Sequence, residues 1–166
     1  MNFEELRLSA LSKADEEPGD EIIDQVVHDA INHGYRLVAT LVDHQLKPTT
    51  LEYSDKILLP DDFHSIVYIK HQDIQLSDDD YYISGMYLFI TNKDFKHDGY
   101  VFDLLYSCYP EPLVEDTDTP VTREVYDYLI VMYGAYNVLL YKKRYNMAEM
   151  LFSEFTSMVG GGADES

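Results

Sequence analysis

Residues 20–44 read DEIIDQVVHDAINHGYRLVATLVDH, and this stretch decides the fold. Its apolar residues recur at steps of three and four, which places their side chains on one face of a helix. They are Ile22, Ile23, Val26, Val27, Ala30, Ile31, Tyr35, Val38, Ala39 and Val42. Asp20 suits the N-cap position, because its carboxylate can accept hydrogen bonds from the first N–H groups of a helix. We therefore predict a long amphipathic helix over 20–44. Gly34 lies inside it, either to allow close approach of a neighbour or as a mild weak point.

Helical patterns also occur at both ends of the chain. The expected helices cover residues 3–12, 121–143 and 146–158. The segment 121–143 carries too many apolar side chains for one narrow stripe. It is therefore either the central helix of the core or a helix with part of its surface on another subunit. The tail 160–166 contains no core-forming residue, and we expect it to be flexible.

The middle of the chain has a different pattern. Between residues 56 and 108, short apolar and aromatic runs are separated by Asp, Gly and Asn, which is typical of strands joined by turns. The terminal helices must meet in space to bury their apolar faces. We therefore predict the α+β class, with a helical bundle formed by the N- and C-terminal helices and a small antiparallel β-sheet inserted between them. Residues 1–159 would form a single domain.

The charge of the chain is strongly negative. It has 31 acidic and 12 basic side chains and a formal net charge of −19. Such a charge repels phosphate backbones, so we expect no specific binding of nucleic acid. Acidic residues dominate the first 24 residues of the chain, whereas a basic cluster near the other end consists of Lys142, Lys143 and Arg144. This polarity suits head-to-tail contacts between copies, and a solvated helix end explains it as well.

No residue pattern marks a catalytic, cofactor or metal site. The six histidines lack the paired spacing of zinc ligands, and Cys108 is the single cysteine. The run Asp78-Asp79-Asp80 lacks the alternating acids and the distal Glu of a calcium loop. Neither a nucleophile elbow nor a phosphate-binding glycine loop occurs. We therefore expect a protein without enzymatic activity and without cofactors.

The start of the chain and its hydropathy bear on location. The chain begins MNFEE, which lacks the basic and apolar regions of a signal peptide. No run approaches the roughly 18 apolar residues that a membrane span needs. We expect a soluble protein that is synthesised in the cytoplasm and has no membrane partner.

Three short motifs gain meaning from their order along the chain. The first is the turn Leu59-Pro60-Asp61-Asp62-Phe63 before the predicted sheet, and the second is YSCYPEPL at residues 106–113 after it. The third is Tyr133-Gly134-Ala135 in the helix that follows. With these motifs in this order, the chain over residues 3–158 resembles the head-to-tail adaptor (connector) proteins of tailed bacteriophages.

The resemblance implies a structural protein of the virion, located in the neck between capsid and tail. Such adaptors form a ring of about twelve copies below the portal protein, which surrounds the channel for DNA. The ring also contacts a downstream tail or neck protein. The C-terminal segment commonly docks on the portal, which here points to residues 146–166. Phe152, Phe155, Met158 and Val159 are the expected portal-binding residues, unless they pack inside the subunit.

Two other functions are compatible with the sequence. The net charge of −19 suits an acidic module that mimics DNA or regulates a protein by binding it. The acidic loops, Asp78–Asp80 above all, could serve a hydrolase or a metal-dependent enzyme whose site is dispersed along the chain.

Overall fold

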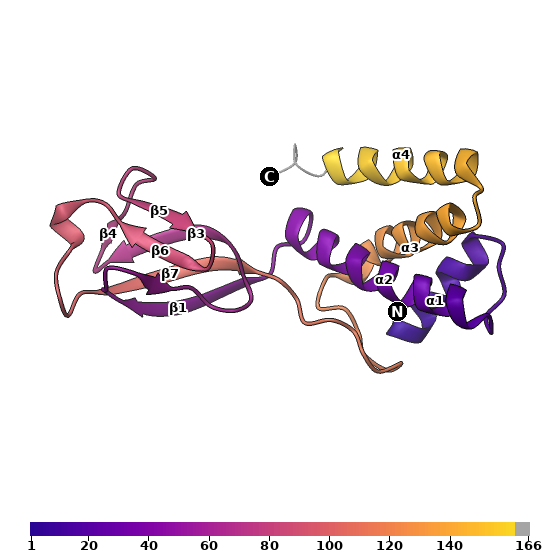
Figure 1. Ribbon diagram of the computed structural model, residues 1–166, viewed down its shortest axis with the longest axis horizontal. Coiled ribbons are helices and arrows are strands. Elements are labelled where there is room, and N and C mark those ends of the chain that lie inside the picture. The colour runs from indigo at the N-terminus through magenta and orange to yellow at the C-terminus, as the bar shows by residue number, and fades with distance from the viewer. Residues whose placement is uncertain (162–166) are drawn as a thin grey trace. The chain divides into compact units, whose positions relative to one another are not determined.

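Four helices come from the two ends of the chain, and the strands come from its middle. The computed structural model describes residues 1–161, whose four helices and two small antiparallel sheets form a mixed α+β fold (Figure 1). This confirms the predicted fold class. Residues 1–44 and 110–161 form one compact unit, here called the helical unit, and residues 45–109 form a second, called the β unit. We expected one domain over residues 1–159, but the two units have separate hydrophobic cores.

The helices lie close to the predicted ranges. They are α1 (Phe3–Lys13), α2 (Glu21–Leu41), α3 (Asp127–Tyr141) and α4 (Tyr145–Gly161), with the 3₁₀ turn η2 (Glu124–Tyr126) before α3. The Asp20 side chain accepts hydrogen bonds from the N–H groups of Ile22 and Ile23, which confirms it as the N-cap. Helix α4 continues through Gly160 and Gly161, which we expected in the tail, because a glycine weakens a helix without ending it. The remaining tail residues, 162–166, lie outside the described residues.

Helix α3 is the central helix of the helical unit. It packs against α1, α2 and α4, and it lies between α2 and α4 in Figure 1. This position explains why the segment 121–143 carries apolar side chains on more than one side. A Cβ atom added at Gly34 would lie 3.0 Å from the Cβ atom of Tyr133. Gly34 therefore allows α2 to approach α3 closely.

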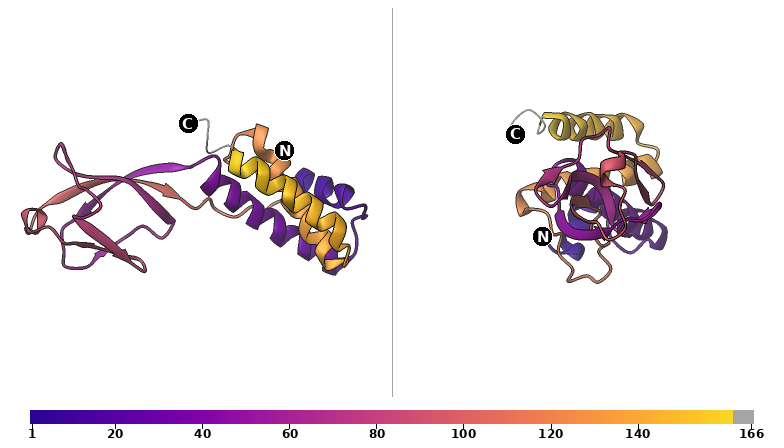
Figure 2. Two further views of the ribbon diagram at one scale, coloured as in Figure 1. Left: turned by 90° about the horizontal axis from the view of Figure 1, so that it is seen from above. Right: turned by 90° about the vertical axis from the view of Figure 1, so that its left-hand side faces the viewer.

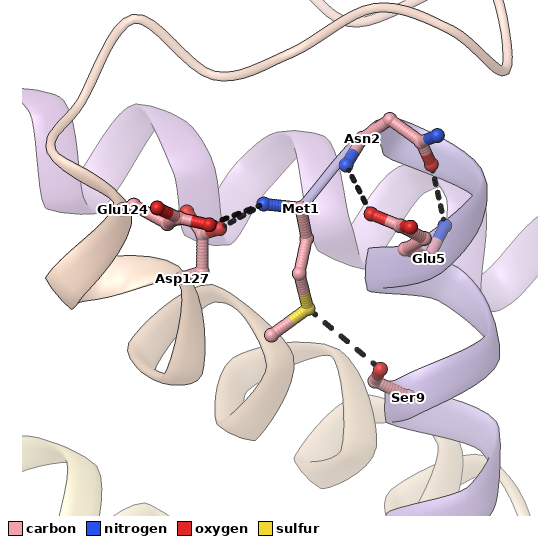
Figure 3. A network of polar contacts seen from close by, with 6 residues as sticks. All are labelled: Met1, Asn2, Glu5, Ser9, Glu124 and Asp127. Carbon is pink, nitrogen blue, oxygen red and sulfur yellow. Dashed lines mark hydrogen bonds and ion pairs between the residues drawn. The ribbon is translucent and has the colours of Figure 1, made fainter.

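The first residues of the chain join α1 to the start of α3 (Figure 3). The amine of Met1 donates a hydrogen bond of 2.5 Å to the buried carboxylate of Asp127. This bond raises the pKa of the amine. Asn2 and Glu5 form a capping box, in which each side chain accepts a hydrogen bond from the backbone N–H of the other. Asp127 is the first residue of α3, where the helix dipole favours its negative charge.

The β unit contains two antiparallel sheets. The strands are β1 (Leu46–Glu52), β2 (Ile57–Leu58), β3 (Phe63–His71), β4 (Ile74–Gln75), β5 (Tyr81–Ser84), β6 (Tyr87–Ile90) and β7 (Val101–Cys108). The strand order is β1-β7-β3-β4 in one sheet and β2-β6-β5 in the other. The end-on view in Figure 2 shows the strands around a shared interior. That interior is filled by Leu51, Ile57, Leu59, Ile69, Leu76, Leu88, Ile90, Phe95, Phe102, Leu104, Tyr106 and Cys108.

Strand β1 was not predicted, and it contains Pro48, which has no N–H to donate to a neighbouring strand. In the structure, the N–H of Cys108 donates to the carbonyl of Gln45, so Gln45 faces β7. Neighbouring residues of a strand alternate in the direction of their backbone groups, and Pro48 therefore faces outward. A proline at an outward position removes no hydrogen bond from the sheet. The strand region consequently begins before residue 56, where we predicted its start.

Candidate functional site

Helix α4 has one face in the core and one face in solvent. Its inner face consists of Ala148 and Phe155, which are buried, and of Leu151 and Val159, which are half-buried. Outside this inner face, α4 also carries large apolar side chains that remain at least 40% exposed. They are Tyr145, Met147, Met150, Phe152 and Met158, with exposed fractions of 40% to 73%. We call this set the α4 outer row.

The four residues expected to bind a partner fall on both faces. Phe152 is 41% exposed, and its ring stacks on Tyr136 at a centroid distance of 4.9 Å. Met158 is 40% exposed. Phe155 is 5% exposed, and its ring lies 5.4 Å from that of Tyr133 in the core. Phe155 therefore packs inside the subunit. Val159 packs partly against the same core.

Two methionines outside the expected set also belong to the outer row. Met150 is 73% exposed and Met147 is 47% exposed. Sequence reasoning passed over both, because methionine is common in cores and its position alone does not distinguish a buried face from an exposed one. A comparison of the two faces of α4 was the signal that could have found them.

The basic cluster before α4 is engaged within the helical unit. Lys142 and Arg144 both form ion pairs with Glu16, at 3.2 Å and 3.1 Å. Arg144 also donates a hydrogen bond of 3.0 Å to the carbonyl of Ala14. These side chains join the end of α3 to the end of α1. A head-to-tail contact between copies would have to compete with these pairs.

Two of the three quoted motifs meet at one end of the β unit. Asp62, in the turn before β3, accepts a hydrogen bond of 2.9 Å from the hydroxyl of Tyr106, near the end of β7. Its other carboxylate oxygen accepts a hydrogen bond of 2.5 Å from the ammonium of Lys47. The backbone carbonyl of Asp62 accepts a hydrogen bond of 2.7 Å from the N–H of Tyr109. Lys47, and then Tyr106, hold the pKa of Asp62 below its usual range. The cluster fixes the two ends of the inserted segment to each other.

The phenol of Tyr106 should lose its proton at a higher pH than an ordinary tyrosine. Burial, and next the hydrogen bond to Asp62, raise the pKa of Tyr106 from 10.0 to about 12. A phenol whose pKa is raised by folding stabilises the fold below its unfolded pKa, and this contribution is lost as the pH rises through 10 toward 12. In a near-ultraviolet absorbance titration, the difference between wild type and Tyr106→Phe should therefore rise near pH 12.

Asp62→Ala is the companion variant for this titration. It removes the hydrogen bond to Tyr106 and keeps the phenol, so the same step should move toward lower pH. A wild-type difference curve with its midpoint at the ordinary tyrosine value would contradict the expectation.

The candidate nucleophiles of the β unit are buried. His64 Nδ1 lies 3.0 Å from the hydroxyl of Ser107, which in turn lies 2.7 Å from the hydroxyl of Ser65. Ser107 and Cys108 are each 2% exposed. Burial raises the pKa of the Cys108 thiol. A substrate could reach neither group without opening of the strand pairing around β7.

The acidic loop Asp78–Asp80 has structural contacts. The carboxylate of Asp80 accepts hydrogen bonds from the N–H and hydroxyl of Ser77 and from the side-chain amide of Asn92. Its pKa is lowered, first by the bond from Asn92. Within residues 1–161, no three His, Cys, Asp or Glu side chains gather as ligands of one metal ion.

The chain matches no protein-family model and no curated protein. Among the described residues, no helix is long and apolar enough to cross a membrane.

Proposed function

We propose that this protein is a structural head-to-tail adaptor of a tailed-bacteriophage virion. Copies of the chain form a ring of about twelve below the portal protein, and each copy uses the α4 outer row to contact the portal. The ring connects the capsid to a tail or neck protein and surrounds the DNA channel. The chain carries no chemical reaction in this function.

The observation that carries the proposal is the unpaired face of α4. The helix contacts α3 on one side only, and its other side exposes Met147, Met150 and Met158. Exposed apolar side chains that gather on one element are typical of surfaces that meet another protein. Methionine suits such a surface, since its unbranched, polarisable side chain adapts to the partner.

The ordered motifs and the charge also support an adaptor. Asp62, in the turn before β3, is bonded to Tyr106 near the end of β7 and to Tyr109 after it, and Gly134 of the third motif lies where α3 meets α1 and α2. A net charge of −19 suits a protein that surrounds a DNA channel, because like charges let DNA pass without phosphate contacts.

Native mass spectrometry of the chain mixed with the portal protein from the same genome tests this function. Association of about twelve copies with the portal ring is the expected result. If a competent portal ring binds no copies, the adaptor function is rejected. Salt-sensitive binding to a nucleic-acid enzyme would then favour the acidic regulatory alternative.

Met150→Lys should abolish or weaken portal binding by about tenfold or more, because it places a charge at the centre of the α4 outer row. Its fold should be retained, since Met150 is 73% exposed. Val125→Lys is the matched control: Val125 is 62% exposed in the helical unit but belongs to η2 and not to α4. Equal portal binding by both variants would show that the outer row is not the contact.

A further inference from the structure

Strand β5 is an unprotected edge of the β unit. It is the last strand of its sheet, paired with β6 on one side only. Its sequence, Tyr81-Tyr82-Ile83-Ser84, contains no charge and no proline. Tyr82 is 53% exposed and Ile83 is 39% exposed. Edge strands of monomeric proteins are usually blocked by charges, prolines, bulges or short length, since a free edge pairs with other strands.

The other edges of the described β unit are blocked in these ways. Strand β1 has Pro48 at an outward position. Strands β2 and β4 are two residues long. The part of β3 that β4 leaves open contains two register irregularities, between Phe63 and Ser65 and between Ile66 and Tyr68. Bulges of this kind twist an edge away from further pairing. Within residues 45–109, β5 is therefore the edge best suited to accept a strand.

The backbone groups that β5 presents outward follow from its register. The N–H of Thr91 donates a hydrogen bond of 2.8 Å to the carbonyl of Asp80, so the backbone groups of Asp80 point toward β6. Because directions alternate along a strand, Tyr81 and Ile83 direct their N–H and C=O groups outward. Two residues can thus exchange four hydrogen bonds with an antiparallel strand.

We propose that β5 pairs antiparallel with β5 of a second copy of this chain. The two strands are related by a two-fold axis, with Tyr82 opposite Tyr82 of the second copy. Tyr81 of each copy is then opposite Ile83 of the other, and each such pair exchanges two backbone hydrogen bonds. The two Tyr82 side chains form a non-hydrogen-bonded pair, in which facing side chains are closest.

The distribution of charge favours this occupant and this direction. In the antiparallel register, Asp79 lies opposite Gly85 of the second copy and Asp78 lies opposite Met86, so no acids face each other. Parallel pairing would place the Asp78–Asp80 runs of both copies side by side, which like-charge repulsion disfavours. An uncharged strand offers a foreign partner no charge to recognise, whereas it is complementary to itself.

This contact is distinct from a ring contact. Pairing of the same strand on both copies is isologous and closes after two copies, whereas a ring needs two different faces. The proposal therefore does not rest on the proposed adaptor function. The pairing of the two β5 strands should become stronger with added salt, because screening reduces the repulsion between two chains of net charge −19.

Sedimentation velocity of the full chain at increasing concentration tests the pairing, with Tyr82→Lys and Tyr82→Glu as the variants. Wild type should form a dimer. Each variant alone should lose the dimer, since identical charges then face each other across the axis. An equimolar mixture should recover it, because Lys faces Glu in the mixed dimer. Tyr82 is 53% exposed, so both variants should fold.

A second pair of variants tests the backbone part. Ile83→Pro removes an outward N–H and should also lose the dimer. Thr50→Pro removes an outward N–H from the edge of β1 in the same way and should leave the dimer intact. A wild-type chain that stays monomeric at all concentrations overturns the proposal. A mixture of the Lys and Glu variants that fails to recover the wild-type dimer overturns it too.

Discussion

Gly134→Ala is expected to lower the free energy of unfolding of the helical unit by about 1–3 kcal/mol, the usual cost of inserting a methyl group into a packed core. The added Cβ atom would lie 2.7 Å from Cδ1 of Ile31 and 2.9 Å from Cβ of Ala10. Ile31 can move the end of its side chain, but Cβ of Ala10 is fixed to the backbone of α1. Helix α1 must therefore shift away from α3.

Two effects of opposite sign compete at this position. Alanine favours a helix over glycine by about 1 kcal/mol, which partly offsets the clash. We expect the clash to prevail, because three helices meet at Gly134 and a shift of α1 loosens the contacts of Leu6 and Leu11 as well. A larger residue increases the cost, so Gly134→Val should be less stable than Gly134→Ala.

Gly160→Ala is the matched control for this prediction. It makes the same chemical change in α4, where an added Cβ atom has no neighbour within 4 Å. Only the gain in helix propensity remains, so Gly160→Ala should raise the free energy of unfolding, by up to about 1 kcal/mol. Urea unfolding followed by circular dichroism measures both variants. A Gly134→Ala protein as stable as wild type would show that α1 approaches α3 less closely than described.

Asn32→Asp should destabilise the helical unit by about 1–2 kcal/mol, because it leaves the partly buried carbonyl of Leu113 without its donor. The amide of Asn32 makes two hydrogen bonds to Leu113, which lies in the segment after β7, here called the exit segment. The amide oxygen accepts a hydrogen bond of 2.7 Å from the N–H of Leu113, and the amide nitrogen donates one of 2.9 Å to the carbonyl of Leu113. Aspartate keeps the shape but loses the donor, and its negative charge then faces the carbonyl oxygen.

The effect should appear where the exit segment joins α2. Leu113 is 4% exposed, and its anchor holds the chain as it returns to the helical unit. We expect faster proteolysis and faster amide exchange after Pro110 in the variant. Asn146→Asp is the control, because Asn146 is exposed and lies in the first turn of α4, where the helix dipole favours an added acid. Equal stability of the two variants would contradict a role for the Asn32 amide in holding Leu113.

The adaptor-like motifs could be found in the sequence, but their contacts could not. The bond between Asp62 and Tyr106 joins residues 44 positions apart, and the bonds between Asn32 and Leu113 join residues 81 positions apart. Neither pair forms a local pattern. The candidate site was likewise found in part: α4 and some of its apolar residues were predicted, whereas the burial of Phe155 and the exposure of Met150 depend on how α4 turns toward α3.

The sequence by itself determined the elements whose causes are local. The apolar period of residues 20–44 and the cap at Asp20 specify α2, since both act within one or two helical turns. Alternating runs and turn residues specify the class of the inserted segment in the same way. Only the tertiary structure decided which residues meet across the chain. Pro48 could be accepted in β1 because its position relative to β7 directs it outward, and Gly134 became a contact of three helices because α1, α2 and α3 converge there. These outcomes depend on packing between distant segments, and no pattern of neighbouring residues records them.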